Sequence, residues 1–318
     1  MKPARAIATG LVLTALLAVL PPWMSPYNVS MLLTIFMYVA LAGSWNLFSG
    51  MTGYVSLGHG LFFGIGAYSF AVATSVFNLP AVMGLVLAVV VPGLVGFVIG
   101  LALLTTRIRI AYFAVVMLGL NEITKTIVAN MKSIGSSYGL TLPGLPNRYV
   151  AYYILLGLAA VVTAVAYFVQ QSRWGYGLKA LLADEVAAEM TGVHTVAHKL
   201  AMFVLSAIFI GLTGAVIAWN WSYVDPYMAF DLTVSFDMLV MAMFGGFGTV
   251  AGPVLGATLR SVVREVLTTS WPNFQPIIFG VLVIILILWC PGGIIQAFEV
   301  AQAKLRMWVS SRPRETAT

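Results

Sequence analysis

Few residues in this sequence have types and spacings that could do chemistry. His194 and His198 stand four residues apart, the spacing at which two histidines on one helix can hold a metal ion. No carboxylate completes an H-E-x-x-H pattern, and Cys290 is the single cysteine, which excludes an intrachain disulfide. A phosphate-binding G-x-x-x-x-G-K-S/T loop is also absent. We predict no catalytic residue, no metal site and no cofactor, and we interpret the histidines as a solvated pair at a helix start.

Glu122 and Lys125 are the charged residues that best fit ion-coupled transport. They lie three residues apart in an apolar stretch long enough to cross a membrane, so they could pair on one helix face. Ionisable residues inside a membrane span often mark ion or proton pathways. An ion-coupled secondary carrier that uses this pair is therefore one functional alternative.

Two glycine-rich segments interrupt the apolar runs. Residues 45–67 read WNLFSGMTGYVSLGHGLFFGIGA, and residues 243–257 read MFGGFGTVAGPVLGA. Backbone polar groups that a helix break releases cannot face lipid, so broken helices are buried in protein or line a water-filled cavity. We predict that both segments line a translocation path. The candidate path residues are Asn46, Gly53, Ser56, Gly58, His59, Gly245, Gly246, Gly248 and Thr249.

Close helix packing is the alternative role for these glycines. Small residues four apart let helices approach each other, and Gly248, Gly252 and Gly256 have that spacing. We assign packing to most of the glycines taken singly and the path to the two segments as wholes. His59 by itself is more typical of a hydrogen-bonded interior histidine than of a proton relay.

The composition indicates that these residues are held by a membrane protein. Hydrophobic residues make up 61% of the chain and charged residues 8%, whereas soluble domains have about 45–50% and about 25%. No charged residue occurs between Arg5 and Arg107. A soluble fold could not hide so much apolar surface, so we predict an all-α polytopic membrane protein with one domain over residues 1–318. The net charge of +6 is typical of basic residues at membrane edges, so we predict contact with membrane lipid and none with nucleic acid.

The apolar runs predict about 8–10 transmembrane helices, including glycine-broken or re-entrant segments. The candidate spans are 6–23, 29–48, 58–77, 80–104, 110–130, 149–169, 199–220, 235–268 as a broken pair, and 275–290. The first run is interpreted as a retained helix because no A-x-A-like cleavage site follows it. Lys and Arg in the short loops place both termini in the cytoplasm, with a tail at 297–318.

The same charge distribution assigns the remaining loops to the two sides. The acidic turn with Asp225, Asp231 and Asp237 falls outside, and both broken segments can be drawn as hairpins that enter from the outside. The charged loop at about 171–199 falls inside.

The inside loop has the pattern of one amphipathic helix over Lys179 to Gly192. Its apolar residues recur at spacings of four and three, and they are Leu178, Leu182, Val186, Met190 and Val193. We expect Gly192 to end this helix and Thr195 to cap the next one. An acidic face fits an anionic lipid surface poorly, so docking into a soluble partner is favoured over a position at the headgroups.

Four blocks of the sequence resemble, in order, the M-type permease subunit of the branched-chain amino acid (Liv) ABC transporters. They read NLFSGMTGYVSLGHGLFFGIGAY, RIRIAYFAVVMLGLNEI, SRWGYGLKALLADEVAAEMTGVHTVAHKLAMFVLSAIFIGLTGAV and LVMAMFGGFGTVAGPVLGA, and they cover most of residues 45–260. The resemblance implies a single transmembrane permease domain in a bacterial inner membrane. It also implies four partners: an H-type permease subunit, two cytoplasmic ATPase subunits and an extracytoplasmic substrate-binding protein.

The resemblance further implies that the inside loop couples the permease to the ATPases. The candidate coupling residues are Lys179, Asp184, Glu185, Ala187, Ala188, Glu189 and Gly192. The general importer pattern has a glutamate directly before the two alanines, whereas Val186 stands there and Glu185 is displaced by one residue. The segment YGLTLPGLP, residues 138–146, is glycine-poor where the family has a TGG-x-x-G type sequence.

These observations together predict a permease subunit of an ABC importer for branched-chain amino acids or similar small neutral solutes, and not an enzyme. An importer of urea or short amides from the same family is a second alternative beside the ion-coupled carrier. The ABC permease explains the loop, the glycine breaks and the scarcity of intramembrane charge together.

Overall fold

The structure is a computed structural model that describes residues 3–106, 108–145 and 147–270, with isolated positions beyond them at 274, 277–278, 280–281, 284 and 293–295. The span predicted at 275–290 therefore lies outside the described residues except at isolated positions. The predicted tail at 297–318 lies wholly outside them.

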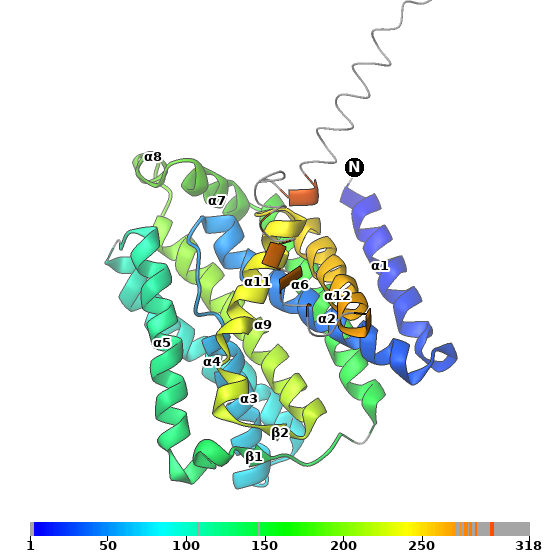
Figure 1. The fold of residues 1–318 in the computed structure, drawn as a ribbon. Coiled ribbons are helices and arrows are strands. Elements are labelled where there is room, and N and C mark those ends of the chain that lie inside the picture. The colour runs from blue at the N-terminus through cyan, green and yellow to red at the C-terminus, as the bar shows by residue number, and fades with distance from the viewer. Residues whose placement is uncertain are drawn as a thin grey trace, which may run out of the picture.

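The described chain is helical almost throughout, which confirms the all-α prediction (Figure 1). The α-helices are α1 (Pro3–Val19), α2 (Pro26–Trp45), α3 (Gly60–Ala71), α4 (Ala81–Thr105), α5 (Ile110–Asn130), α6 (Arg148–Gln171), α7 (Arg173–Ala183), α8 (Glu185–Met190), α9 (Thr195–Trp221), α10 (Pro226–Ala229), α11 (Leu232–Gly245) and α12 (Ala251–Ser270). The π-helical turns are η2 (Asn46–Gly50) and η3 (Val72–Val76), and the 3₁₀ turns are η1 (Pro21–Trp23), η4 (Lys132–Ile134) and η5 (Ser136–Tyr138). Strands β1 (Leu140–Thr141) and β2 (Tyr223–Val224) form one antiparallel pair in which Leu140 faces Val224.

The helix lengths fit a polytopic membrane protein. Within the described residues, six helices are long and apolar enough to cross a membrane, and Ala8–Val19 and Gly60–Val76 are shorter apolar helices. The predicted spans up to residue 268 each coincide with one helix or, for 235–268, with the pair α11 and α12. Apolar runs set these boundaries because a helix satisfies its backbone N–H and C=O groups internally and can therefore cross lipid.

The centre of the bundle is α9, against which α3 and α4 pack. A Cβ atom on Gly66 would lie within 3.0 Å of the Gly211 backbone, and one on Gly214 within 3.0 Å of the Phe63 carbonyl. Cβ atoms do not adopt such separations, so α3 and α9 require glycine at this crossing. The packing role assigned to single glycines is therefore confirmed here.

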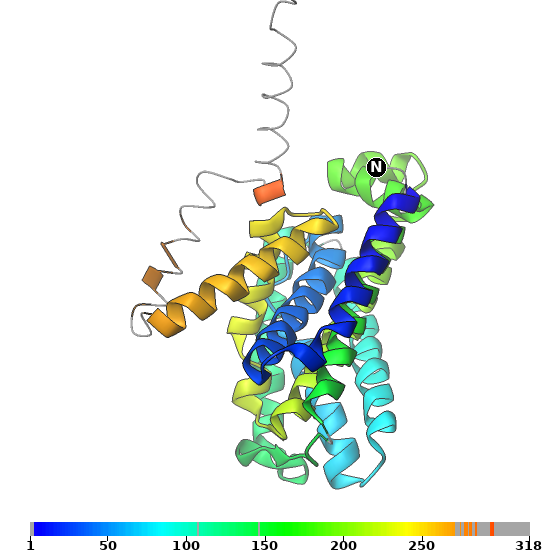
Figure 2. The ribbon, with the colours of Figure 1, turned by 90° about the vertical axis from the view of Figure 1, so that its right-hand side faces the viewer.

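The two ends of the bundle carry different elements. The N-terminal end of α1 and helices α7 and α8 lie at one end, and the β1–β2 pair lies at the opposite end (Figures 1 and 2). Segment 53–59 joins α2 to α3 without helical structure, and residues 246–250 separate α11 from α12. Helix α12 then runs back along α11 and contacts α2.

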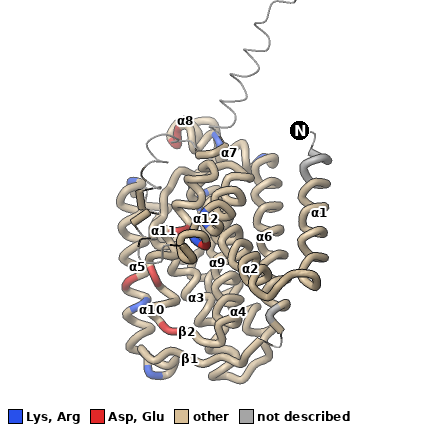
Figure 3. The backbone as a smooth tube through the Cα atoms, turned by 45° about the vertical axis from the view of Figure 1, so that its right-hand side comes forward, with Lys and Arg blue, Asp and Glu red and all other residues tan. Residues whose placement is uncertain are grey.

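Asp237 is not part of an acidic outside turn, so that prediction is wrong for this residue. Asp225 and Asp231 do cap helices, with side chains that accept backbone N–H bonds at the starts of α10 and α11. Asp237 instead lies within α11, where it is buried and forms an ion pair with Arg260 of α12. In Figure 3, acidic and basic positions lie next to each other beside the labels α11 and α12. The cause is the early start of α11 at Leu232, which carries residue 237 into the bundle.

Candidate functional site

The first glycine-rich segment contains a helix break. Helix α2 continues through the π-turn η2 to Thr52, after which the chain is non-helical until Gly60. Gly53 opens this stretch with φ +78°, a left-handed conformation that favours glycine. The Trp45 indole N–H donates to the Ser56 carbonyl oxygen at 2.9 Å, and the Ser56 N–H donates to the Ser49 hydroxyl at 3.3 Å. Side chains of α2 and η2 therefore satisfy part of the backbone that the break releases.

The second segment contains a tight turn between α11 and α12. Gly246 and Gly248 have φ values of +133° and +72°, and a Cβ atom on Gly245 would overlap the Gly252 carbonyl. The Thr249 hydroxyl donates to the Gly246 carbonyl oxygen at 2.8 Å and accepts the Gly252 N–H at 3.0 Å. These contacts close a hairpin whose two arms could not approach with larger residues.

The structure brings the two breaks together at one place, here called the break junction (Asn46, Gly50, Gln170, Gly248 and Thr249). The Asn46 side chain donates to the Thr249 carbonyl oxygen and accepts the Gly248 N–H, each at 2.9 Å. Gln170 donates to the Gly248 carbonyl oxygen at 2.7 Å, and a Cβ atom on Gly248 would lie 2.8 Å from the Gly50 carbonyl oxygen. One buried amide, which lies just before the first break, thus satisfies backbone groups that the second break releases.

Gly58 and His59, at the end of the first break, are both buried. A Cβ atom on Gly58 would overlap the Met117 carbonyl of α5, so this glycine permits a close approach. His59 is fully buried among Phe48, Phe62 and Phe203, with ring centroids 5.5–5.6 Å away. Within the described residues neither ring nitrogen has a hydrogen-bond partner. The interior position agrees with the prediction, but the predicted hydrogen bond is absent from the described structure because aromatic rings surround the imidazole.

The loop at 171–199 forms two helices, so the prediction of one continuous helix over Lys179 to Gly192 is wrong. Asp184 has extended backbone angles, and its carboxylate accepts the N–H groups of Val186 and Ala187 at 2.9 and 3.0 Å. Such N-caps compete with continuation of the preceding helix. The apolar stripe is therefore divided between α7 and α8.

The end of α8 forms as the sequence predicts, but the start of α9 does not. Gly192 has φ +87°, its N–H bonds to the Glu189 carbonyl, and the Val193 N–H bonds to the Ala188 carbonyl, which is a Schellman C-cap. The prediction that Thr195 caps α9 is wrong. His194 occupies the N-cap position, Thr195 is the first helical residue, and its hydroxyl donates to the Glu189 carboxylate at 2.7 Å.

Exposure divides the coupling candidates into two groups. Ala188 is buried, whereas Lys179 and Ala187 are exposed. The stripe residues of α8 point outward, with Val186 69% and Met190 86% exposed, while Leu178 of α7 is buried. Four exposed apolar side chains of α7 and α8 are together called the docking surface below, after the role proposed for them in the next subsection: Tyr176, Leu182, Val186 and Met190.

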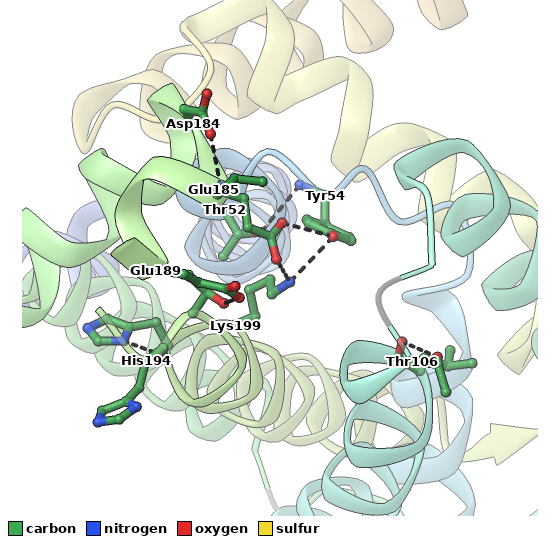
Figure 4. Close-up of polar contacts among 12 residues, drawn as sticks. Thr52, Tyr54, Thr106, Asp184, Glu185, Glu189, His194 and Lys199 are labelled. Atoms are coloured by element: carbon green, nitrogen blue, oxygen red, sulfur yellow. Dashed lines mark hydrogen bonds and ion pairs between the residues drawn. The ribbon is translucent and has the colours of Figure 1, made fainter. Parts of the chain in front are cut away.

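Glu185 is only partly exposed, and its carboxylate is paired. It forms an ion pair of 2.5 Å with Lys199, the fully buried lysine in the first turns of α9 (Figure 4). The Tyr54 hydroxyl donates to Glu185 at 3.1 Å and lies 3.4 Å from the Lys199 ammonium. Burial, and then the Glu185 carboxylate, raise the pKa of Tyr54 to about 12, so its hydroxyl stays protonated near neutral pH.

Sequence reasoning missed Tyr54 and Lys199 as site residues. The available signal was Lys199 itself, a charge within an apolar run that a membrane protein rarely leaves without a partner. Its partners could not be assigned, because Tyr54 lies 145 residues away.

The ionisable residues considered for ion coupling and for metal binding lie outside both breaks. Glu122 and Lys125 form the predicted pair on α5, with N–O separation 2.5 Å and side chains 37% and 24% exposed. His194 stands at the N-cap position of α9 without a side-chain capping bond, and the His198 Nδ1 atom lies 2.8 Å from the His194 carbonyl oxygen. Among the described residues, no three His, Cys, Asp or Glu side chains are grouped so that they could hold a metal ion.

Comparison of the sequence with known proteins identifies a family. A sequence model described as "Branched-chain amino acid transport system / permease component" matches residues 27–288. The chain is 29% identical to the high-affinity branched-chain amino acid transport system permease protein LivM of Salmonella typhimurium (strain LT2), with 90% of this chain and 74% of that protein covered. LivM of Escherichia coli (strain K12) has the same identity and coverage. No solved structure matches the chain. Because the family match covers most of its length, this chain belongs to the branched-chain amino acid transport system permease family.

Proposed function

We propose that the chain is the M-type permease subunit of an ABC importer for branched-chain amino acids or similar small neutral solutes. In this proposal it works in a bacterial inner membrane with an H-type permease subunit, two cytoplasmic ATPase subunits and an extracytoplasmic substrate-binding protein. The names of both LivM relatives favour branched-chain amino acids over urea or short amides. The relatives are transport components, which agrees with the expectation that the chain is not an enzyme.

The docking surface is the observation that carries the proposal. It lies at the end of the bundle that also holds the start of α1, which the charge distribution assigns to the cytoplasm (Figure 2). Burying an exposed side chain such as Val186, Leu182 or Met190 at a partner contributes about 1.5–3 kcal/mol to the free energy of binding. The carboxylates of Asp184 and Glu189 beside it oppose a resting place on anionic lipid. A groove on a soluble ATPase subunit fits both features.

The breaks supply parts that can move. Segment 53–59 and residues 246–250 lack the helical hydrogen bonds that hold the neighbouring helices straight. Residues 246–250 are held by side-chain bonds to Asn46 of η2, just before segment 53–59, and such bonds can be exchanged more readily than a helical turn can be unwound. In the proposed cycle, ATPase docking favours one of two packings of these segments, and the solute path opens to alternate sides.

Replacing Met190 with glutamate is expected to lower retention of the ATPase subunits by about tenfold or more. The change puts a charge in the middle of a contact that would otherwise bury an apolar side chain, and about 1.4 kcal/mol already corresponds to tenfold in affinity. The tagged permease is purified with its coexpressed partners, and the amount of ATPase that copurifies is measured.

Met131→Glu is the matched control. Met131 is also exposed, but it follows the C-terminal end of α5, which is the end away from the proposed cytoplasmic side. Retention of ATPase in this control should equal that of the wild type. If Met190→Glu and Val186→Glu both retain as much ATPase as the wild type, the docking surface is not where the ATPase binds.

A further inference from the structure

One cluster of side chains, Tyr54, Glu185 and Lys199, connects three separate parts of the chain. Tyr54 belongs to the non-helical segment 53–59, Glu185 begins α8 and Lys199 lies in α9 (Figure 4). The Lys199 ammonium lies 2.5 Å from the Glu185 carboxylate, 3.4 Å from the Tyr54 hydroxyl and 4.5 Å from the centroid of the Tyr54 ring. Helix α8 is therefore tied directly to segment 53–59, the first break.

The burial of Lys199 makes this connection stiff. An ammonium group removed from water is unstable unless a carboxylate, hydrogen-bond acceptors or an aromatic face compensate it. Here the compensation comes from α8 through Glu185 and from segment 53–59 through Tyr54. If α8 moved without segment 53–59, the contact between Glu185 and Tyr54 would break, and the ammonium would keep only part of its compensation.

The three parts of the chain that the cluster joins differ in how easily they can move. Helix α8 is capped at both ends, by Asp184 and by the Gly192 turn, so it can shift as a unit. Helix α9 is held by packing against α3 and α4. Segment 53–59 is non-helical, and a Cβ atom on its first residue, Gly53, would lie 3.0 Å from a Leu182 methyl of α7. Movement of α7 and α8 is thus passed to segment 53–59 more readily than to α9.

We propose that Tyr54, Glu185 and Lys199 are the positioning residues that transmit movement of the docking helices to the first break, with Lys199 as the fixed point. This inference rests on the proposed function, because it requires that an ATPase subunit moves α7 and α8. It adds a specific route that neither the family match nor the coupling-loop pattern contains. The route predicts that docking and transmission can be separated by substitution.

The test uses Lys199→Met and Tyr54→Phe in the complete complex, reconstituted in proteoliposomes with ATPase and binding-protein partners. Methionine fills the buried volume without the charge, and phenylalanine keeps the ring while removing the hydroxyl bonds. Hydrogen exchange is measured at α7–α8 and at segment 53–59, with and without ATP and vanadate, together with uptake of radiolabelled leucine. Lys132→Met and Tyr138→Phe, both exposed near the β1–β2 end, are the matched controls.

In the wild type and the controls, nucleotide should change exchange both at α7–α8 and at segment 53–59. In the two variants the change at α7–α8 should persist while that at segment 53–59 is lost, and uptake should fall about tenfold for Lys199→Met, within the usual range of coupling between sites. Tyr54→Phe should show the same pattern with a smaller loss, and it decides alone if Lys199→Met does not fold. A normal response at segment 53–59 with normal uptake in Tyr54→Phe would overturn the inference. No response at α7–α8 in the wild type would overturn the docking proposal, and this inference with it.

Discussion

Asp237→Leu is expected to destabilise the protein by about 3–5 kcal/mol, the usual effect of removing one partner of a buried ion pair. The carboxylate pairs with Arg260, and both side chains are almost completely buried between α11 and α12. The Arg260 guanidinium also lies 4.5 Å over the Tyr38 ring, and Arg264 donates to the Tyr38 hydroxyl at 2.9 Å. Without Asp237 a buried positive charge loses its carboxylate, so α11 and α12 should no longer pack tightly against each other. Thermal unfolding in detergent, with denaturant titration, measures the loss.

Two further variants separate the ion pair from general damage to α11. Asp231→Leu removes only a helix cap and should cost about 1 kcal/mol. The double variant Asp237→Leu/Arg260→Met should recover most of the lost stability, because apolar residues can replace a buried pair at little cost. If the single variant is no less stable than Asp231→Leu, or the double variant is worse than the single one, the ion pair does not hold the hairpin.

Gly58→Ala is expected to destabilise the protein by about 3 kcal/mol or more, at the upper end of overpacking effects. The new methyl group would overlap the Met117 carbonyl, which is helix backbone and cannot turn aside as a side chain can. Segment 53–59 would be pushed away from α5, so leucine uptake by any folded fraction should fall as well. Unfolding and uptake are measured on the same preparation.

Gly119→Ala provides the control on the same helix that Gly58 contacts. Nothing lies within 4 Å of a Cβ atom at Gly119, so alanine should be neutral or should stabilise α5 by about 0.5–1 kcal/mol through its higher helix propensity. Equal stability of the Gly58 and Gly119 variants would mean that segment 53–59 does not approach α5 as closely as described.

The helices and the positions of both breaks could be predicted because their causes are local. Apolar runs of membrane-spanning length set α2, α4, α5, α6 and α9, and clustered glycines marked the two interruptions. The end of α8 was equally predictable, since Gly192 supplies the left-handed turn of a C-cap. None of these features depends on a distant partner.

The features that sequence reasoning missed depend on tertiary contacts. Asn46 bonds to a backbone about 200 residues away, and Lys199 finds Glu185 and Tyr54 only after α8 has folded back over the bundle. Helical spacing from Leu178 to Val193 could not show that Asp184 would cap a new helix instead of continuing the old one. Asp237 was predicted to lie in an outside turn because the sequence does not show its partner. That partner, Arg260, lies on the returning arm of the hairpin.

Uptake of radiolabelled leucine by proteoliposomes tests the proposed function most directly. Liposomes with the full set of partners should accumulate leucine only when ATP is present, and excess valine or isoleucine should compete whereas urea and acetamide should not. The permease chain alone, given a proton or sodium gradient, should take up no more leucine than empty liposomes. Ion-driven uptake by the chain alone that disappears in Glu122→Gln would contradict the ABC permease assignment and support the carrier based on Glu122 and Lys125.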